Sequence, residues 1–241
     1  MEIKVFDSVQ KVGQAAAMIF AAQLMKNPRS VLGLATGSTP IPTYQQLIAL
    51  YQEGLVDFSQ AQSYNLDEYC GLSHEHVCSY YYFMHEQLFD HINIAKDAVH
   101  VPSGMAQDFD AECKGYDAAI AKAGGVDLQL LGIGRNGHIA FNEPDACFTH
   151  GTHVVSLTKS TIQANRRFFD SEDQVPTRAI TMGVGSIMAA RQILLLATGE
   201  DKAEAIRDTV KGDITPQVQA SILRTHPNVV VLLDREAASL L

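Results

Sequence analysis

The sequence lacks several features that mark particular classes of protein. Its 18 basic residues are outnumbered by 27 acidic ones, and the net charge of −9 argues against a nucleic-acid or anionic-membrane partner. The four cysteines have no CxxC or zinc-type spacing, so we expect reduced thiols in a cytoplasmic protein. The N-terminus has no secretory-signal pattern, and the apolar runs are too short to span a membrane.

The chain also lacks any feature that would divide it. No linker, low-complexity tract or internal repeat interrupts the 241 residues, and 46% of them are hydrophobic, as in ordinary globular proteins. We therefore predict a single domain that spans residues 1–241.

Short apolar segments alternate with helical patterns along most of the chain. Strands are expected at 31–36, 61–65, 126–131, 153–157, 192–198 and 228–234, and helices at 8–26, around 44–51, and at 79–92, 108–122 and 201–212. Strands that are apolar throughout are typical of a parallel sheet covered on both faces. The pattern predicts a three-layer, Rossmann-like α/β fold with a mostly parallel sheet.

Polar clusters follow four of the expected strands, and ligands in such folds bind outside the carboxyl ends of the strands. The clusters are TGST at 36–39, LDEY at 66–69, GRNGH at 134–138 and TGEDK at 198–202. We expect these four clusters to meet at one edge of the sheet.

Two of the clusters have the properties of a phosphate site. Thr36, Gly37, Ser38 and Thr39 lie between a strand and a helix, where backbone N–H groups and hydroxyls favour an anion. Lys202 lies in the first turn of a later helix, a position that the helix dipole disfavours unless an anion is near. A capped turn and a solvated surface lysine remain the alternatives.

The LDEY cluster places two carboxyl groups side by side. Adjacent residues of an extended chain point to opposite sides, so we expect one of Asp67 and Glu68 to face the site and the other to be structural. A metal site that also uses His74 and His76 is an alternative. No metal-binding spacing supports it, and we predict no metal.

Residues 132–144 carry the strongest sign of acid–base chemistry. Three glycines between 132 and 137 allow a sharp turn and a close approach to a ligand. His138 follows them, and Glu143 comes five residues later. Because histidine exchanges protons readily near neutral pH, we predict that His138 is a catalytic group supported by a carboxylate.

Several motifs together resemble one family. The segments GLATGSTP, NLDEYCGL, EHVCSYYYFMHEQLFDHI, GIGRNGHIAFNEP, ANRRFFD and TMGVGSI occur in order between about residues 30 and 235. In this set the chain resembles the glucosamine-6-phosphate deaminases, also called glucosamine-6-phosphate isomerases. The 6-phosphogluconolactonases share that fold, but they lack FNEP and carry other residues in place of LDEY.

The resemblance implies a hydrolase that isomerises an amino-sugar phosphate and removes its nitrogen. Glucosamine 6-phosphate and water would give fructose 6-phosphate and ammonia, without a metal or organic cofactor. His138 would open the sugar ring, oriented by Asn136 and Glu143, and Asp67 would move a proton from C2 to C1. Many members have aspartate where this chain has Asn136, so a negative charge is missing there.

The resemblance also assigns the substrate phosphate and a lid. The phosphate would bind to the turn at 36–39, with Lys202 and Arg167 adding positive charge. Residues of about 157–180 would form a lid over the site. Members activated by N-acetylglucosamine 6-phosphate have basic residues in place of His153 and Val155, and a longer C-terminal extension. We therefore expect a non-allosteric monomer or weak homo-oligomer.

Three other functions remain as alternatives. Galactosamine 6-phosphate could be handled by the same residues, because its difference at C4 is not readable from the motifs. A lactonase would need a base for water attack but no acid–base group for C2. A sugar-phosphate-sensing regulator would need a DNA-binding segment, and the sequence shows no basic helix-turn-helix pattern.

Overall fold

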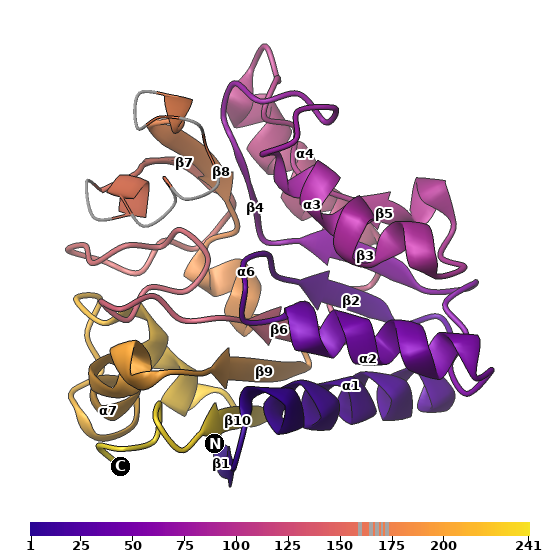
Figure 1. Cartoon of the computed structure of the whole chain (residues 1–241). Helices are drawn as coiled ribbons and strands as arrows, with labels where there is room; N and C mark the ends of the chain where they lie inside the picture. Colours follow the sequence, from indigo (N-terminus) through magenta and orange to yellow (C-terminus); the bar gives the residue numbers. More distant parts are fainter. Residues whose placement is uncertain (159–160, 164–165, 167–168, 170, 172–173) are drawn as a thin grey trace.

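The computed structural model describes residues 1–158, 161–163, 166, 169, 171 and 174–241. Within these residues, seven parallel strands form the main sheet, in the order β1-β10-β9-β6-β2-β3-β5 (Figure 1). The strands are β1 (Glu2–Phe6), β2 (Val31–Leu34), β3 (Gln62–Asn65), β5 (Val99–His100), β6 (Leu128–Leu131), β9 (Gln192–Ala197) and β10 (Val229–Asp234).

A second, antiparallel sheet is formed by β4 (Asp67–Tyr69), β8 (Arg178–Thr181) and β7 (His153–Ser156), in that order. The strand expected at 153–157 therefore exists but belongs to this smaller sheet. The LDEY cluster, which we expected to lie in a loop after the strand, contributes β4. Both departures have one cause: these segments pair outside the main sheet, where their side chains need not be apolar on both faces.

The helices agree with most of the expected positions. The α-helices are α1 (Val9–Lys26), α2 (Ile41–Gln52), α3 (Tyr80–Gln87), α4 (Phe109–Lys122), α6 (Val184–Met188) and α7 (Ala203–Lys211). The 3₁₀ helices are η1 (Phe89–His91), η2 (Lys96–Ala98), η5 (Glu200–Lys202) and η6 (Gln219–Thr225). The expected helix at 79–92 is thus α3 followed by the 3₁₀ turn η1.

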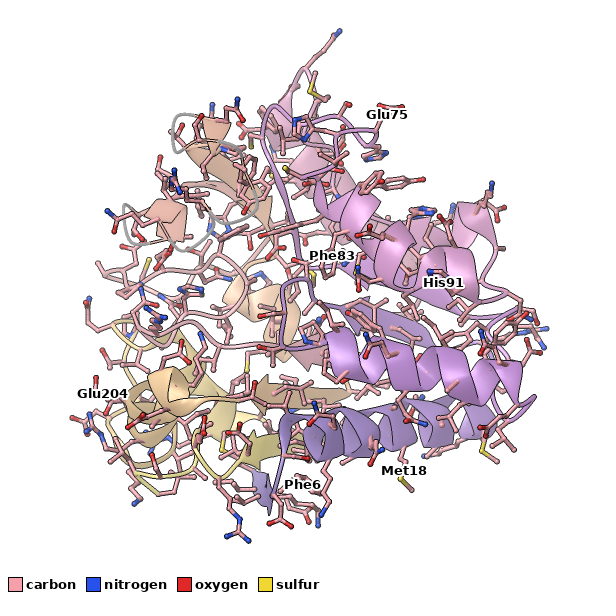
Figure 2. The ribbon with its side chains drawn as sticks, viewed as in Figure 1. Phe6, Met18, Glu75, Phe83, His91 and Glu204 are labelled. Atoms are coloured by element: carbon pink, nitrogen blue, oxygen red, sulfur yellow. The ribbon has the colours of Figure 1, made fainter. Side chains whose placement is uncertain are left out.

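Both faces of the main sheet are covered. Every residue of β2 and β6 is buried, although successive side chains point to opposite faces. Figure 1 shows α1 and α2 side by side along the sheet. Met18 projects outward from α1, away from the sheet (Figure 2), and is 68% exposed, so this side of the helix faces solvent. The expectation of a mostly parallel, Rossmann-like sheet is confirmed.

The order of the strands reverses in the middle of the sheet. From β2 the chain continues outward through β3 to β5, and from β6 it continues in the opposite direction through β9 to β10. Such a reversal leaves space for a ligand at the carboxyl ends of the two strands beside it. The neighbours in order are β3, β2, β6 and β9, and these are the strands that the four polar clusters follow. The expected convergence at one edge is confirmed.

Sequence patterns did not indicate the strands β1, β5 and β8 or the helix α6. β1 has exposed and half-exposed side chains throughout, β5 has only two residues, and β8 and α6 are short. Such segments have too few buried positions to show a period. No helix among the described residues has both the length and the apolar character needed to cross a membrane.

Burial in the central strands should dominate the stability of the fold. Leu194 in β9 is fully buried, so Leu194→Ala should lower the free energy of unfolding by about 2–5 kcal/mol. Leu55, which is 58% exposed, provides the matched control, and Leu55→Ala should change it by about 0.5 kcal/mol or less. Urea unfolding measures both. Equal losses for the two variants would contradict the packing described.

Candidate active site

The turn after β6 presents His138 against a glycine. The imidazole of His138 lies directly over Gly134, where an added Cβ would overlap three atoms of the ring. The turn is closed by a hydrogen bond from the Gly134 N–H to the His138 carbonyl (2.9 Å) and by Gly137, whose φ of +79° favours glycine. The glycine at 134 is therefore required for the position of the ring.

Glu143 is held beside this imidazole. Its Oε2 lies 3.3 Å from Nδ1 of His138 and accepts a hydrogen bond from the Asn136 amide (2.6 Å). Its Oε1 accepts hydrogen bonds from the hydroxyls of Thr161 and Thr158. Burial opposes the charged form, but the nearby imidazole of His138 and the hydrogen bonds from Thr161 and Asn136 outweigh it and lower the pKa of Glu143 to about 2. Glu143 is therefore an anion across the physiological pH range.

Asn136 contacts both Glu143 and His138. While its amide donates to Glu143, its Oδ1 accepts a hydrogen bond from the backbone N–H of His138 (3.2 Å). The side chain therefore joins the carboxylate to the main chain of the turn, and its contact with His138 is through the backbone.

Asp67 and Glu68 have very different surroundings on β4. Asp67 is only 6% exposed, and its carboxyl accepts no hydrogen bond from the described residues. Burial, with a smaller effect from the neighbouring Glu68, raises the pKa of Asp67 to about 8. Glu68 is fully buried and accepts three backbone hydrogen bonds, from Tyr69, Tyr80 and Tyr81. Burial nevertheless raises the pKa of Glu68 to about 7.

The two carboxyls divide as the alternation of strand side chains predicts. The Glu68 side chain points to the start of α3, whereas no described residue donates a hydrogen bond to the Asp67 carboxyl. No group of three or more His, Cys, Asp or Glu side chains in the described part of the chain is placed to hold a metal ion. The suggested combination with His74 and His76 is therefore not assembled.

The hydroxyls of the turn at 36–39 do not cap the helix that follows. Gly37 has a φ of +94°, and α2 has Pro40 as its N-cap residue and no side-chain cap, so neither Ser38 nor Thr39 caps the helix. The alternative of a simple Ser/Thr-capped turn does not describe this geometry. Thr36 contacts the hydroxyl of Tyr80, which connects the turn to α3.

Lys202 lies after β9, two strands away from this turn. Gly199 turns the chain with a φ of +90°, and its N–H donates to the carboxylate of Asp234 (3.0 Å). The Nζ of Lys202 lies 3.8 Å from Asp201, and the side chain is 20% exposed, unlike a fully solvated lysine. Arg167, the other expected phosphate ligand, lies outside the described residues.

Three residues at the site were not anticipated. Thr158 and Thr161 bind Glu143, and Tyr80 connects α3 to the site through Thr36 and Tyr69. The threonines are far from Glu143 in sequence and lie in no quoted motif. The tyrosine lies in EHVCSYYYFMHEQLFDHI, one of the segments that resemble the family, but the helical pattern of this segment also fits simple packing. No sequence signal separates such supporting residues from their neighbours.

The raised pKa of Asp67 has a consequence for stability. Between pH 4 and pH 8 the folded protein holds a proton on this carboxyl that the unfolded chain has lost, so wild-type stability should fall as the pH rises. Asp67→Asn removes this proton. Its free energy of unfolding relative to wild type should therefore increase from pH 4 to pH 8 and then level off. Urea unfolding at several pH values measures the difference, and a constant difference would contradict the assignment.

Comparison with known proteins identifies relatives over the full chain. The family described as glucosamine-6-phosphate isomerases/6-phosphogluconolactonase matches residues 6–231. A glucosamine-6-phosphate deaminase of Thermoanaerobacter pseudethanolicus is 52% identical over 241 residues, which cover all of this chain and 95% of the relative. One of Alkaliphilus oremlandii is 51% identical and covers all of both chains.

Solved structures agree with these matches. A structure described as a monomeric glucosamine-6-phosphate deaminase has a TM-score of 0.98 and 46% identity, with all of both chains covered. A 6-phosphogluconolactonase from Leishmania guyanensis has a TM-score of 0.74 and 22% identity, covering 98% of this chain and 97% of that one, and shares the fold. The resemblance seen in the sequence motifs is thus confirmed, and the chain belongs to the glucosamine-6-phosphate isomerase/6-phosphogluconolactonase family.

Proposed function

We propose that this chain converts glucosamine 6-phosphate and water to fructose 6-phosphate and ammonia. The proposal is supported by the name shared by relatives that are about half identical over the full chain. Its main structural support is the contrast between two carboxyls in the segments that follow β3 and β6. Glu143 is hydrogen-bonded and ionised, whereas Asp67 is buried and has a raised pKa. Groups with such opposed environments can act as separate acid–base catalysts in one site.

The first step assigned to this site is opening of the sugar ring. One proton must leave the anomeric hydroxyl and one must reach the ring oxygen. His138 is suited to both transfers, because imidazole can give and take a proton near neutral pH. The carboxylate of Glu143, 3.3 Å from Nδ1, fixes the ring and would stabilise it when it takes up a proton.

The second step is transfer of a proton from C2 to C1, which we assign to Asp67. Removal of the C2 proton from the open-chain aldehyde gives an enolamine, and return of a proton to C1 gives an imine at C2. A carboxylate with a raised pKa is a stronger base than an exposed one and suits abstraction from carbon. Water then adds to the imine carbon, and ammonia leaves with the C–N bond electrons after protonation of the nitrogen.

Substrate binding is assigned to the neighbouring strand ends. The turn of Thr36, Gly37, Ser38 and Thr39 offers backbone N–H groups before α2 for the phosphate, together with the hydroxyls of Ser38 and Thr39, which do not cap that helix. Lys202 would add positive charge, as would Arg167. Residues of about 157–180 would form a lid, and Thr158 and Thr161 of this segment already contact Glu143. We also propose a single-domain, non-allosteric monomer or weak homo-oligomer of the cytoplasm that works without a cofactor.

Ammonia release tests the proposal directly. Wild type, Asp67→Asn and the exposed control Asp110→Asn would be given glucosamine 6-phosphate in the presence of EDTA. Release by wild type and the control, with a loss on the order of 10²- to 10⁴-fold in Asp67→Asn, is expected for a general base. No release by wild type, together with hydrolysis of 6-phosphogluconolactone, would favour a lactonase. Release from galactosamine 6-phosphate alone would indicate the other epimer, and binding without turnover would indicate a sensor.

The contact between His138 and Gly134 gives a second test. Gly134→Ala places a methyl group where the imidazole lies, so it should displace the catalytic ring and lower kcat on the order of 100-fold or more. Gly115→Ala, at an exposed helical position with open space around it, is the matched control and should keep full activity. Circular dichroism would establish that both variants are folded. Full activity in folded Gly134→Ala would contradict the role of His138.

A further inference from the structure

The carboxylate of Glu68 occupies the start of α3. Its Oε1 accepts hydrogen bonds from the backbone N–H groups of Tyr69 (2.8 Å) and Tyr80 (2.9 Å), and its Oε2 accepts one from Tyr81 (3.0 Å). Tyr80 and Tyr81 are the first two residues of the helix, where N–H groups have no acceptor within the helix and the dipole favours an anion. Glu68 therefore connects β4 to α3.

This connection also bears on the position of Asp67. Because the Asp67 carboxyl has no hydrogen bond to the described residues, its place depends on the backbone of β4. Across the small sheet Asp67 pairs with Thr181, whose hydroxyl accepts a hydrogen bond from the backbone N–H of Phe141 (3.1 Å). Phe141 lies between His138 and Glu143 in the chain, so β4 is the element that sets Asp67 relative to them.

The start of α3 contacts the same loop. The ring of Tyr80 stacks on Phe141, with ring centres 6.1 Å apart, and its hydroxyl lies 3.2 Å from that of Tyr69. The carboxylate of Glu68 thus joins three parts of the site: the strand of Asp67, the start of α3 and, through Tyr80, the loop of His138. A shift of this carboxylate would move Asp67 relative to the reacting atoms.

Glu68 also supplies charge. The titratable groups whose charges interact with Asp67 include Glu68 and Tyr69 of β4, Tyr80 of α3 and Tyr116 of α4. The three tyrosines have raised pKa values because they are buried, and they are neutral at physiological pH. Glu68 is the acidic member of this set, and its negative charge makes Asp67 harder to ionise.

We propose that Glu68 is a positioning residue for the reaction, which anchors the strand of Asp67 to the start of α3 and keeps a negative charge beside the base. This inference rests on the proposed function, with Asp67 as the C2 base. It predicts that the carboxylate cannot be replaced by an amide. In either orientation, the NH₂ group of a glutamine would face at least one backbone N–H donor.

The test compares Glu68→Gln and Glu68→Asp with wild type. Glu68→Gln keeps the length of the side chain and removes its charge, whereas Glu68→Asp keeps the charge and is too short to hold the same contacts. Met84→Ala, which removes a fully buried side chain from α3, controls for a general loss of stability. Ammonia release would be followed as kcat, KM and the pH profile of kcat/KM. Urea unfolding would measure the stability of each variant.

Glu68→Gln should lower kcat on the order of 10- to 100-fold with KM little changed, because a base misplaced by about 1 Å loses much of its effect. The rising limb of kcat/KM, which reports ionisation of the base in the free enzyme, should move to lower pH once the neighbouring charge is gone. Glu68→Asp should lower kcat and leave the limb in place. Met84→Ala should be destabilised while kcat and the limb stay as in wild type.

A folded Glu68→Gln variant with wild-type kcat and an unmoved rising limb of kcat/KM would overturn the inference. A decrease in kcat no greater than that of Met84→Ala would overturn it as well. If Glu68→Gln does not fold, Glu68→Asp decides, because an unchanged kcat in that variant would overturn the positioning role. The wild-type and Asp67→Asn arms separate this inference from the function on which it rests. Inactive wild type, or active Asp67→Asn, would contradict the proposed function or its base rather than the role of Glu68.

Discussion

The reversal of strand order between β2 and β6 is the constraint on which the site depends. Because the chain leaves β2 in one direction and β6 in the other, the loops after these strands separate instead of covering each other. The turn at 36–39 and the glycine-rich turn before His138 therefore open at the same edge. The neighbouring strands β3 and β9 add the Asp67 and Lys202 segments on either side. A parallel sheet buried on both faces holds these four strand ends in fixed positions.

Two carboxyls within this frame have opposite electrostatic surroundings. Glu143 is partly buried, but donors from His138, Asn136, Thr158 and Thr161 surround it and keep it charged. Asp67 is buried and has no such donor among the described residues, so its charged form is unfavourable. Burial destabilises a carboxylate anion. In Glu143 the surrounding donors offset this effect, whereas in Asp67 burial raises the pKa and makes the carboxylate a stronger base. This division supports a ring-opening pair at His138 and a separate carbon base at Asp67.

Much of the main sheet could be predicted because its strands are apolar on both faces, and Gly134 with His138 could be recognised from residue type and spacing. The smaller sheet was less readable, since β4, β7 and β8 are short, and β7 is half-buried. The role of Glu68 in holding α3 depends on contacts with residues twelve and thirteen positions further along the chain. The roles of Thr158 and Thr161 depend on contacts with Glu143, from which β7 separates them in the sequence. Spacing rules do not reach such distances. The assignment of Arg167 stays a prediction, because this residue lies outside the described part of the chain.

The central claim is that one base moves a proton from C2 to one face of C1. It is tested most directly by giving the protein glucosamine 6-phosphate deuterated at C2, in D₂O, and locating deuterium in the product by NMR. Every hydrogen that the base can deliver is then deuterium, whether or not it exchanges with solvent. If one base makes this transfer, the fructose 6-phosphate carries deuterium at a single one of the two C1 positions. Deuterium divided between both positions would contradict it.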